Sequence, residues 1–160
     1  MDFINILKDV VSEQAVTLIT EGQSWSSTKI SSPLKNPGRC NNYHQYRSGR
    51  GGYYHDACDT PTPVGTPLYA PHDGDFSESS NNLCGNGIII KGIDGDGKKL
   101  HSGFCHLRSR EVPQSGKVKK GDLIGFTGGE SGKPGAGNTS GPHLHWTFKV
   151  NGTKTNPYTY

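Results

Sequence analysis

The segment Gly141–Phe148 constrains the fold most, because it begins with a Gly-Pro turn and then alternates polar and apolar residues from His143 to Phe148. This alternation is typical of a β-strand with one face in a core, since side chains at i and i+2 point to the same side. His143 and His145 are therefore expected on one face, with Leu144 and Trp146 on the other. Two imidazoles on one rigid face can begin a metal site or an acid–base pair. Taken alone, so short a motif is more often two surface histidines on an edge strand.

The rest of the chain also consists of short apolar runs between turns. Its 160 residues include 23 glycines and 10 prolines, and hydrophobic residues make up only 30%. The aromatic residues supply bulk for a core, so an all-β domain with tight turns fits better than disorder. The apolar runs lie at residues 67–70, 74–76, 87–93, 99–107, 122–127 and 143–150. Between two of them, the Asp-Gly-Asp-Gly sequence at 94–97 predicts a hairpin. It is not read as a calcium loop, because the downstream glutamate of an EF-hand is missing.

The first 39 residues differ from the rest. Residues 2–20 repeat apolar side chains at helical spacing and predict a short N-terminal helix, and residues 22–39 indicate a linker or an irregular wrap. We therefore expect an extension over 1–39 and one domain over 40–160. No stretch approaches the roughly 20 apolar residues of a transmembrane helix. No clear signal peptide is found either, because charged residues interrupt any apolar core near the N-terminus: Asp2, Lys8, Asp9 and Glu13.

The charge of the chain is mildly basic, with a net charge of +3 and an isoelectric point near 8.6. Such a balance favours weak attraction to an anionic polymer or surface. It is not the footprint of a nucleic-acid-binding protein, so no nucleic acid partner is expected.

The four cysteines contain no Cys-x-x-C pair, so neither a zinc ribbon nor a thioredoxin-type site is indicated. Four cysteines allow three pairings. We expect the one that joins sequence neighbours, Cys40–Cys58 and Cys84–Cys105, which suits an oxidising compartment. Buried free thiols are the alternative.

Further histidines stand beside a carboxylate and at the end of an apolar run. His55 and Asp59, four residues apart, share one face, so they can chelate one metal ion or form a surface hydrogen bond. His101 and His106 are an odd number of residues apart, so a continuous strand would bring only one of them to a site. By the same reasoning Cys105 faces away from His106, which would place its disulfide behind the sheet while His106 enters the site.

A long glycine-rich stretch over residues 128–141 precedes the strand with the paired histidines. It precedes a strand and lacks Gly-Lys-Ser/Thr, so it is not a phosphate loop. Long loops beside a site usually line or cover it. Of the remaining histidines, His44 and His72 are read as surface residues.

Five motifs follow one another in the order of a known family. They are His55-x-x-x-Asp59, Val64–Pro71, Cys105–Leu107, Val118–Gly128 and Gly141–Trp146. In this order and spacing, roughly residues 40–152 resemble the LytM/lysostaphin-type zinc metallopeptidases. The resemblance implies a mainly β fold with a central antiparallel sheet as the floor of a groove and loops as its walls. Residues 1–39 lie outside it.

The resemblance also implies a role for individual residues. His55, Asp59 and His145 would ligate Zn²⁺, and His106 and His143 would be the catalytic histidines beside it. Family members typically cut peptide cross-links or stems of bacterial peptidoglycan. We therefore expect a monomeric endopeptidase that is secreted, periplasmic or otherwise extracytoplasmic. The groove walls, which would select the bond, are expected at residues 41–54, 77–86 and 128–141.

The chain departs from the family pattern at one motif. A glycine and an aliphatic residue usually precede the ligand aspartate, whereas this chain has Ala57–Cys58 there. The stretch Cys40–Arg47 resembles a cysteine-bearing animal branch of the fold, whose members keep zinc but lack a catalytic histidine. A non-catalytic zinc-containing module that binds peptidoglycan or a receptor is therefore the alternative, and His106 favours the enzyme. Asn41 or Asn42 is a candidate to fill the open zinc position in a latent form. The bond cut and the histidine that acts as base stay open.

Overall fold

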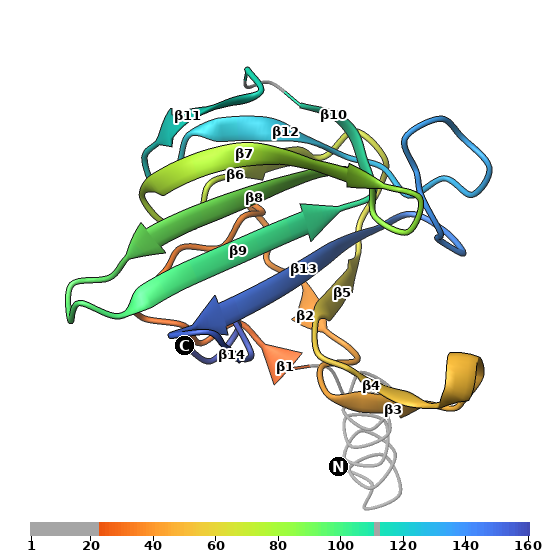
Figure 1. Ribbon diagram of the computed structural model, residues 1–160, viewed down its shortest axis with the longest axis horizontal. Helices are drawn as coiled ribbons and strands as arrows, with labels where there is room; N and C mark the ends of the chain where they lie inside the picture. The colour runs from red at the N-terminus through yellow and green to blue at the C-terminus, as the bar shows by residue number, and fades with distance from the viewer. Residues whose placement is uncertain (1–22, 111–112) are drawn as a thin grey trace, which may run out of the picture.

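The computed structural model describes residues 23–110 and 113–160, which form antiparallel β-strands (Figure 1). The helix predicted over residues 2–20 lies outside the described residues. A seven-stranded sheet, the main sheet, has the order β11-β7-β8-β9-β13-β14, and β5 also pairs with β13. Its strands are β5 (Cys58–Pro61), β7 (Gly74–Asn81), β8 (Gly85–Ile93), β9 (Lys99–Cys105), β11 (Ser115–Val118), β13 (His143–Val150) and β14 (Thr153–Lys154). The predicted mainly β fold with a central antiparallel sheet is confirmed.

Three smaller sheets complete the described fold. One has three strands in the order β10-β12-β6, namely β10 (Leu107–Arg110), β12 (Leu123–Thr127) and β6 (Pro67–Tyr69). The other two pair β1 (Gln23–Ser24) with β2 (Arg39–Cys40) and β3 (Gln45–Arg47) with β4 (Tyr53–His55). A short 3₁₀ turn, η1 (Gly49–Gly51), lies between β3 and β4. No helix in the described part of the chain is long and apolar enough to cross a membrane.

The core lies against one face of the main sheet and follows the alternation seen in the sequence. The residues that alternate with the histidines of β13 are buried: Leu144, Trp146 and Phe148. The Trp146 ring stacks on Phe104, with centroids 5.6 Å apart, and on Trp25, at 6.2 Å. Because this face of β13 is fixed in the core, His143 and His145 are turned to the opposite face.

The segment between β1 and β2 is irregular but belongs to the packed domain. Ile30 and Leu34 are only 4% exposed and join the core. The N–H of Tyr69 donates a hydrogen bond to the carbonyl of Pro33 at 2.9 Å, which ties the segment to β6. In its described residues this segment is therefore an irregular wrap, one of the two forms that the sequence allows.

His72 is buried, which corrects the expected surface position. The side chain is satisfied inside the protein: its Nδ1–H donates to the carbonyl of Asp73 at 2.9 Å, and its Nε2 accepts from the Ser102 hydroxyl at 2.9 Å. Burial lowers the pKa of His72. The proline before His72 indicates a turn, but the sequence does not show whether a side chain in that turn points into the core or into solvent.

Candidate metal centre and active site

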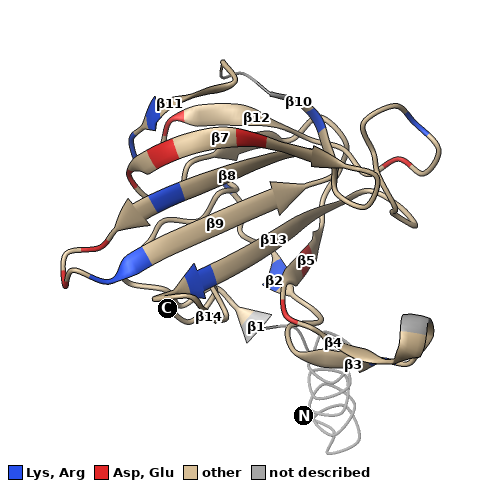
Figure 2. Cartoon of the chain, in the orientation of Figure 1, with Lys and Arg blue, Asp and Glu red and all other residues tan. Residues whose placement is uncertain are grey.

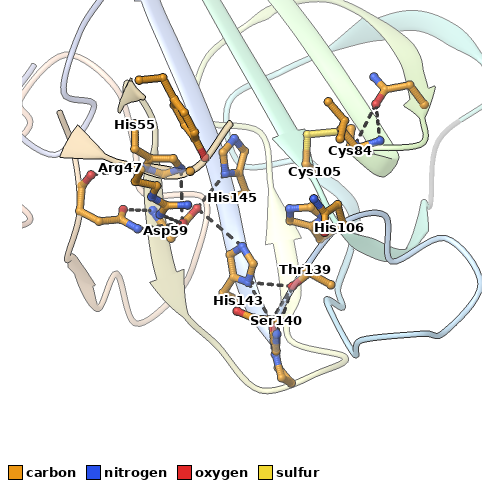
Figure 3. Close-up of a pocket in the computed structure, with 18 residues that line it drawn as sticks. Arg47, His55, Asp59, Cys84, Cys105, His106, Thr139, Ser140, His143 and His145 are labelled. Atoms are coloured by element: carbon orange, nitrogen blue, oxygen red, sulfur yellow. Dashed lines mark hydrogen bonds and ion pairs between the residues drawn. A yellow bond between two sulfur atoms is a disulfide. The ribbon is translucent and has the colours of Figure 1, made fainter. Parts of the chain in front are cut away.

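Three neighbouring strands bring the candidate residues to one face of the main sheet. The register pairs Asp59 of β5 with His145 of β13, and pairs His145 with Cys105 of β9 on its other side. Directly paired residues point to the same face of a sheet. His55, the last residue of β4, lies beside this row, with its ring centroid 5.2 Å from that of His145 (Figure 3).

The metal-binding atoms of His55, Asp59 and His145 converge. His145 Nδ1 lies 2.7 Å from Asp59 Oδ1, and His55 Nε2 lies 3.4 Å from Asp59 Oδ2. The three residues offer ligand atoms that all lie within 4.8 Å of one another. Two imidazoles and one carboxylate are a donor set that zinc uses in proteins, so these residues fit the predicted ion. His106 and His143 form a second such group with His145, but it lacks a carboxylate to offset the charge of a cation.

Asn42 orients two of these residues at once. Its side-chain amide donates to Asp59 Oδ2 at 2.7 Å and accepts from the Asp59 backbone N–H at 2.9 Å. The backbone carbonyl of Asn42 accepts a hydrogen bond from His55 Nδ1–H at 3.3 Å, which leaves Nε2 of that ring for a metal. Arg47 Nη2 adds a contact to Asp59 Oδ2 at 3.0 Å. Such outer partners fix the orientation of metal ligands. The sequence offered Asn42 only as a plug for zinc and gave no signal for Arg47.

Asp59 is held in its ionised form. Burial on its own would raise the pKa of Asp59, but hydrogen bonds from His145 and Asn42, with the charges of His145 and His55, hold the pKa well below its usual range. The carboxylate is the form that binds a cation.

The two remaining histidines are fixed through their Nδ1 atoms. His106 Nδ1–H donates to the carbonyl of Ala136 at 2.6 Å, and His143 Nδ1–H donates to the carbonyl of Gly141 at 2.8 Å. Their ring centroids are 4.9 Å apart. Burial, assisted by the charges of His143 and His145, lowers the pKa of His106. The neutral His106 ring therefore keeps the Nε2 lone pair available, as a general base requires.

The backbone turn at His106 corrects the expected position of the second disulfide. Cys105 is paired with His145 and lines the groove, so its bond to Cys84 lies on the groove side and not behind the sheet. His106 has a left-handed φ of 62°, between the ends of β9 and β10. The parity argument failed because it assumed one continuous strand through this residue. As expected, His106 reaches the site, whereas His101 lies further along β9 and outside the groove lining.

A groove of about 1310 Å³ surrounds these residues, and all three predicted walls contribute to it. Residues 41–54 supply Asn42, Arg47, Gly49 and Tyr53; residues 77–86 supply Asn81, Leu83 and Cys84; and the glycine-rich stretch supplies Asn138, Thr139, Ser140 and Gly141. Disulfides close the expected pairs, Cys40–Cys58 and Cys84–Cys105. The five histidine and aspartate side chains of the candidate site thus lie together in one open groove.

Comparison with known families identifies this arrangement. The model of peptidase family M23 matches residues 53–157. The chain belongs to peptidase family M23. This M23 chain is 38% identical over 106 residues to the peptidoglycan DD-endopeptidase ShyC of Vibrio cholerae, which covers 66% of this chain and 22% of that protein. It is 30% identical over 131 residues to the DD-carboxypeptidase/endopeptidase Mpg of Neisseria meningitidis, which covers 81% of this chain and 26% of that protein.

The fold of the chain is also similar to solved structures of peptidase catalytic domains. The catalytic domain of the antimicrobial peptidase lysostaphin from Staphylococcus simulans is 30% identical, with a TM-score of 0.56 over 74% of this chain and 82% of that one. The catalytic domain of the prophage-encoded M23 protein EnpA from Enterococcus faecalis is 26% identical, with a TM-score of 0.59 over 86% of this chain and 97% of that one. The M23 chain thus has the size of a catalytic domain and spans only 22% and 26% of the two curated relatives.

Proposed function

We propose that this M23 chain is a zinc metalloendopeptidase that hydrolyses peptide bonds in bacterial peptidoglycan. One observation supports the proposal most: a His/Asp/His donor set and two further histidines, each fixed through Nδ1, meet in one groove. The names of the relatives point to the same polymer, since ShyC and Mpg are both described as endopeptidases and ShyC as acting on peptidoglycan. A peptidoglycan substrate implies work outside the cytoplasm, and we propose that the chain acts there as a monomer.

His55, Asp59 and His145 would hold the zinc ion. Zinc supplies a Lewis acid that polarises a carbonyl group and acidifies water. The contribution of the chain is to orient two of these ligands and to keep Asp59 ionised. Asn42 and the hydrogen bond to the Asn42 carbonyl orient Asp59 and His55, and the ionised Asp59 offsets part of the ion's charge.

His106 and His143 would move the protons of the reaction. We assign the general base to His106, because its lowered pKa keeps the ring neutral and its Nδ1–H is committed to Ala136. His106 Nε2 would accept a proton from the attacking water and pass it to the leaving amine. His143, 4.9 Å from His106 between ring centroids, would donate a hydrogen bond to the developing oxyanion when its Nε2 is protonated.

The alternative is a zinc-containing module of the same fold that binds peptidoglycan or a receptor without cutting. The fixed positions of His106 and His143 favour the enzyme, since binding alone does not need two oriented imidazoles beside the ligand set. The two functions differ in one outcome, the release of a defined fragment from the polymer.

The test is digestion of purified peptidoglycan with glycine bridges and of peptidoglycan with direct D-Ala–diaminopimelate links, with products identified by mass spectrometry. We expect cleavage at one defined peptide bond in at least one polymer. His106→Ala should lose turnover and keep its zinc, whereas Asp59→Ala should lose the zinc itself, as measured by elemental analysis. His44→Ala, an exposed histidine paired with Asp56, is the matched control and should retain both. Full activity of His106→Ala would refute its assignment, and zinc-loaded protein that cuts neither polymer would favour the binding module.

A further inference from the structure

A row of charged residues crosses the main sheet away from the metal centre. The register pairs Lys117 with Asp75, Asp75 with Lys91, Lys91 with His101, His101 with Lys149, and Lys149 with Lys154. Because directly paired residues share a face, all six lie in one line across β11, β7, β8, β9, β13 and β14. Figure 2 shows the basic segments of β8, β9 and β13 gathered toward the same end of the sheet, opposite the glycine-rich loop.

Two lysines near the centre of this line form no ion pair of their own among the described residues. Lys117 is paired with Asp75 at 2.7 Å, and Lys154 with Asp56 at 3.3 Å. In the described part of the chain, neither Lys91 nor Lys149 has a carboxylate within ion-pair distance. We call Lys91, His101 and Lys149 the cation row. In the register, Lys91 stands between Asp75 and His101, and Lys149 stands between His101 and Lys154.

The cation row is concave and accessible. It lines a groove of about 820 Å³ on the sheet surface. The other charged residues of the lining are three lysines and two aspartates: Lys99, Lys117, Lys119, Asp73 and Asp75. Lys91 is exposed and Lys149 is half-buried. His101 lies between them, and burial together with the charges of Lys149 and Lys91 lowers its pKa. Two ammonium groups and the imidazole between them therefore line one small area of this groove.

This area lies on the same face of β13 as the metal centre, in a separate groove that shares no lining residue with the first. Lys149 follows His145 by four residues on the same face of β13, a distance of roughly 13 Å at the rise of an extended strand. Between them lies a low surface, formed by Thr147 and its partner Gly103. A Cβ added to Gly103 would meet no atom closer than 3.9 Å, so the sheet surface is open at this position.

We propose that the cation row is a second substrate-binding site, which holds a carboxylate of a peptidoglycan peptide while another part of the same peptide lies at the metal centre. The proposal rests on the function proposed above. Stem peptides carry several free carboxylates, and the spacing of roughly 13 Å corresponds to about four residues of extended peptide. The cation row would thus act on binding and not on the chemical step.

The test measures cleavage as a function of polymer concentration with the zinc-loaded full chain. The variant is Lys91→Gln/Lys149→Gln, and the matched control is Lys35→Gln/Lys120→Gln, which removes two exposed lysines elsewhere. Each protein is assayed on native peptidoglycan and on the same polymer with its carboxyl groups amidated. Co-sedimentation with the insoluble polymer, in a His106→Ala background, measures binding without cleavage.

We expect the cation-row variant to raise KM on native polymer by roughly three- to tenfold with kcat retained, the range that two solvent-exposed ion pairs supply. The difference should vanish on amidated polymer and shrink at high salt, and the control should match the wild type. An unchanged KM and unchanged co-sedimentation would refute the cation row while leaving the peptidase in place. If the wild-type protein cuts neither polymer but the variant still co-sediments more weakly than the wild type, the peptidase function is refuted and the binding role of the cation row is supported. If the difference in binding between the variant and the wild type disappears when teichoic acids are removed from the wall, the ligand of the cation row is a phosphodiester and not a peptide carboxylate.

Discussion

The two disulfides make a matched pair, because each ends one residue before a candidate site residue. Cys40–Cys58 precedes the proposed zinc ligand Asp59, and Cys84–Cys105 precedes His106, the proposed general base. We predict that removing either bond costs a similar amount of stability but affects a different function. The perturbation is the double Cys→Ser variant at each bond, studied with the other bond intact.

The stability loss follows from the length of chain that each bond closes. The sequence separations are 18 and 21 residues. In the chain-entropy account, loops of this length contribute about 3 kcal/mol each through the unfolded state. Urea unfolding of the two variants should therefore give losses of free energy of unfolding that agree within about 1 kcal/mol.

The functional losses should separate. The His106 N–H donates to the carbonyl of Cys84 at 2.8 Å, so the second disulfide holds the turn that presents this imidazole. Its loss should lower kcat by on the order of tenfold to a hundredfold, since small misplacements of catalytic groups have such effects. Zinc should stay bound, because no ligand belongs to this turn. Loss of Cys40–Cys58 frees the strand that carries Asp59, and should weaken zinc binding by roughly ten- to a hundredfold.

The assays are competition for zinc with a chromogenic chelator and single-turnover cleavage at saturating zinc. The reasoning would be refuted by a variant without Cys84–Cys105 that keeps full kcat at a temperature where it is folded. It would equally be refuted if both variants lost zinc to the same extent, because the disulfides would then act only through global stability.

Two further predictions concern single side chains. Asn42→Ala should weaken zinc binding about tenfold, because Asp59 loses two hydrogen bonds; chelator competition measures this, with the exposed neighbour Asn41→Ala as control. Burial lowers the pKa of His72 in the folded state, so the unfolded state binds more protons at acid pH. The contribution of the neutral His72 to the free energy of unfolding is therefore complete above about pH 6.5 and is lost as the pH falls. Urea titrations of zinc-free protein between pH 5 and 8 should show a weaker pH dependence for His72→Asn than for the wild type, and equal slopes would contradict the assignment.

Patterns that depend on strand periodicity could be predicted from the sequence. The alternation around His145 placed both histidines of β13 on the face opposite the buried Trp146. The alternation repeats along a strand, so the residues themselves carry this information. The antiparallel floor and the loop walls were instead implied by the family resemblance of the five motifs, and the three walls line the groove as expected.

The remaining features depend on contacts that no period describes. Asn42, which precedes β3, and Arg47, at the end of β3, both contact Asp59 of β5, and nothing in their spacing predicts that meeting. His106 enters the groove through a left-handed backbone position, which non-glycine residues adopt only rarely. His72 finds its partner in Ser102, 30 residues away. Each of these positions is set by tertiary structure and not by the local sequence.

The departure from the family pattern before Asp59 leaves the metal centre intact for a structural reason. Ala57 and Cys58 are both buried, and Ala57 is not among the described residues with positive φ, so the usual glycine is not needed for the backbone. Cys58 pairs with Trp146, on the core face of β5, one step from the row that joins Asp59 to His145. A slip of one residue would turn every side chain of the strand to the wrong face. The buried Cys58, its bond to Cys40 and its pairing with Trp146 oppose that slip. The cysteine therefore performs the task of the aliphatic residue and keeps Asp59 on the face that it shares with His145.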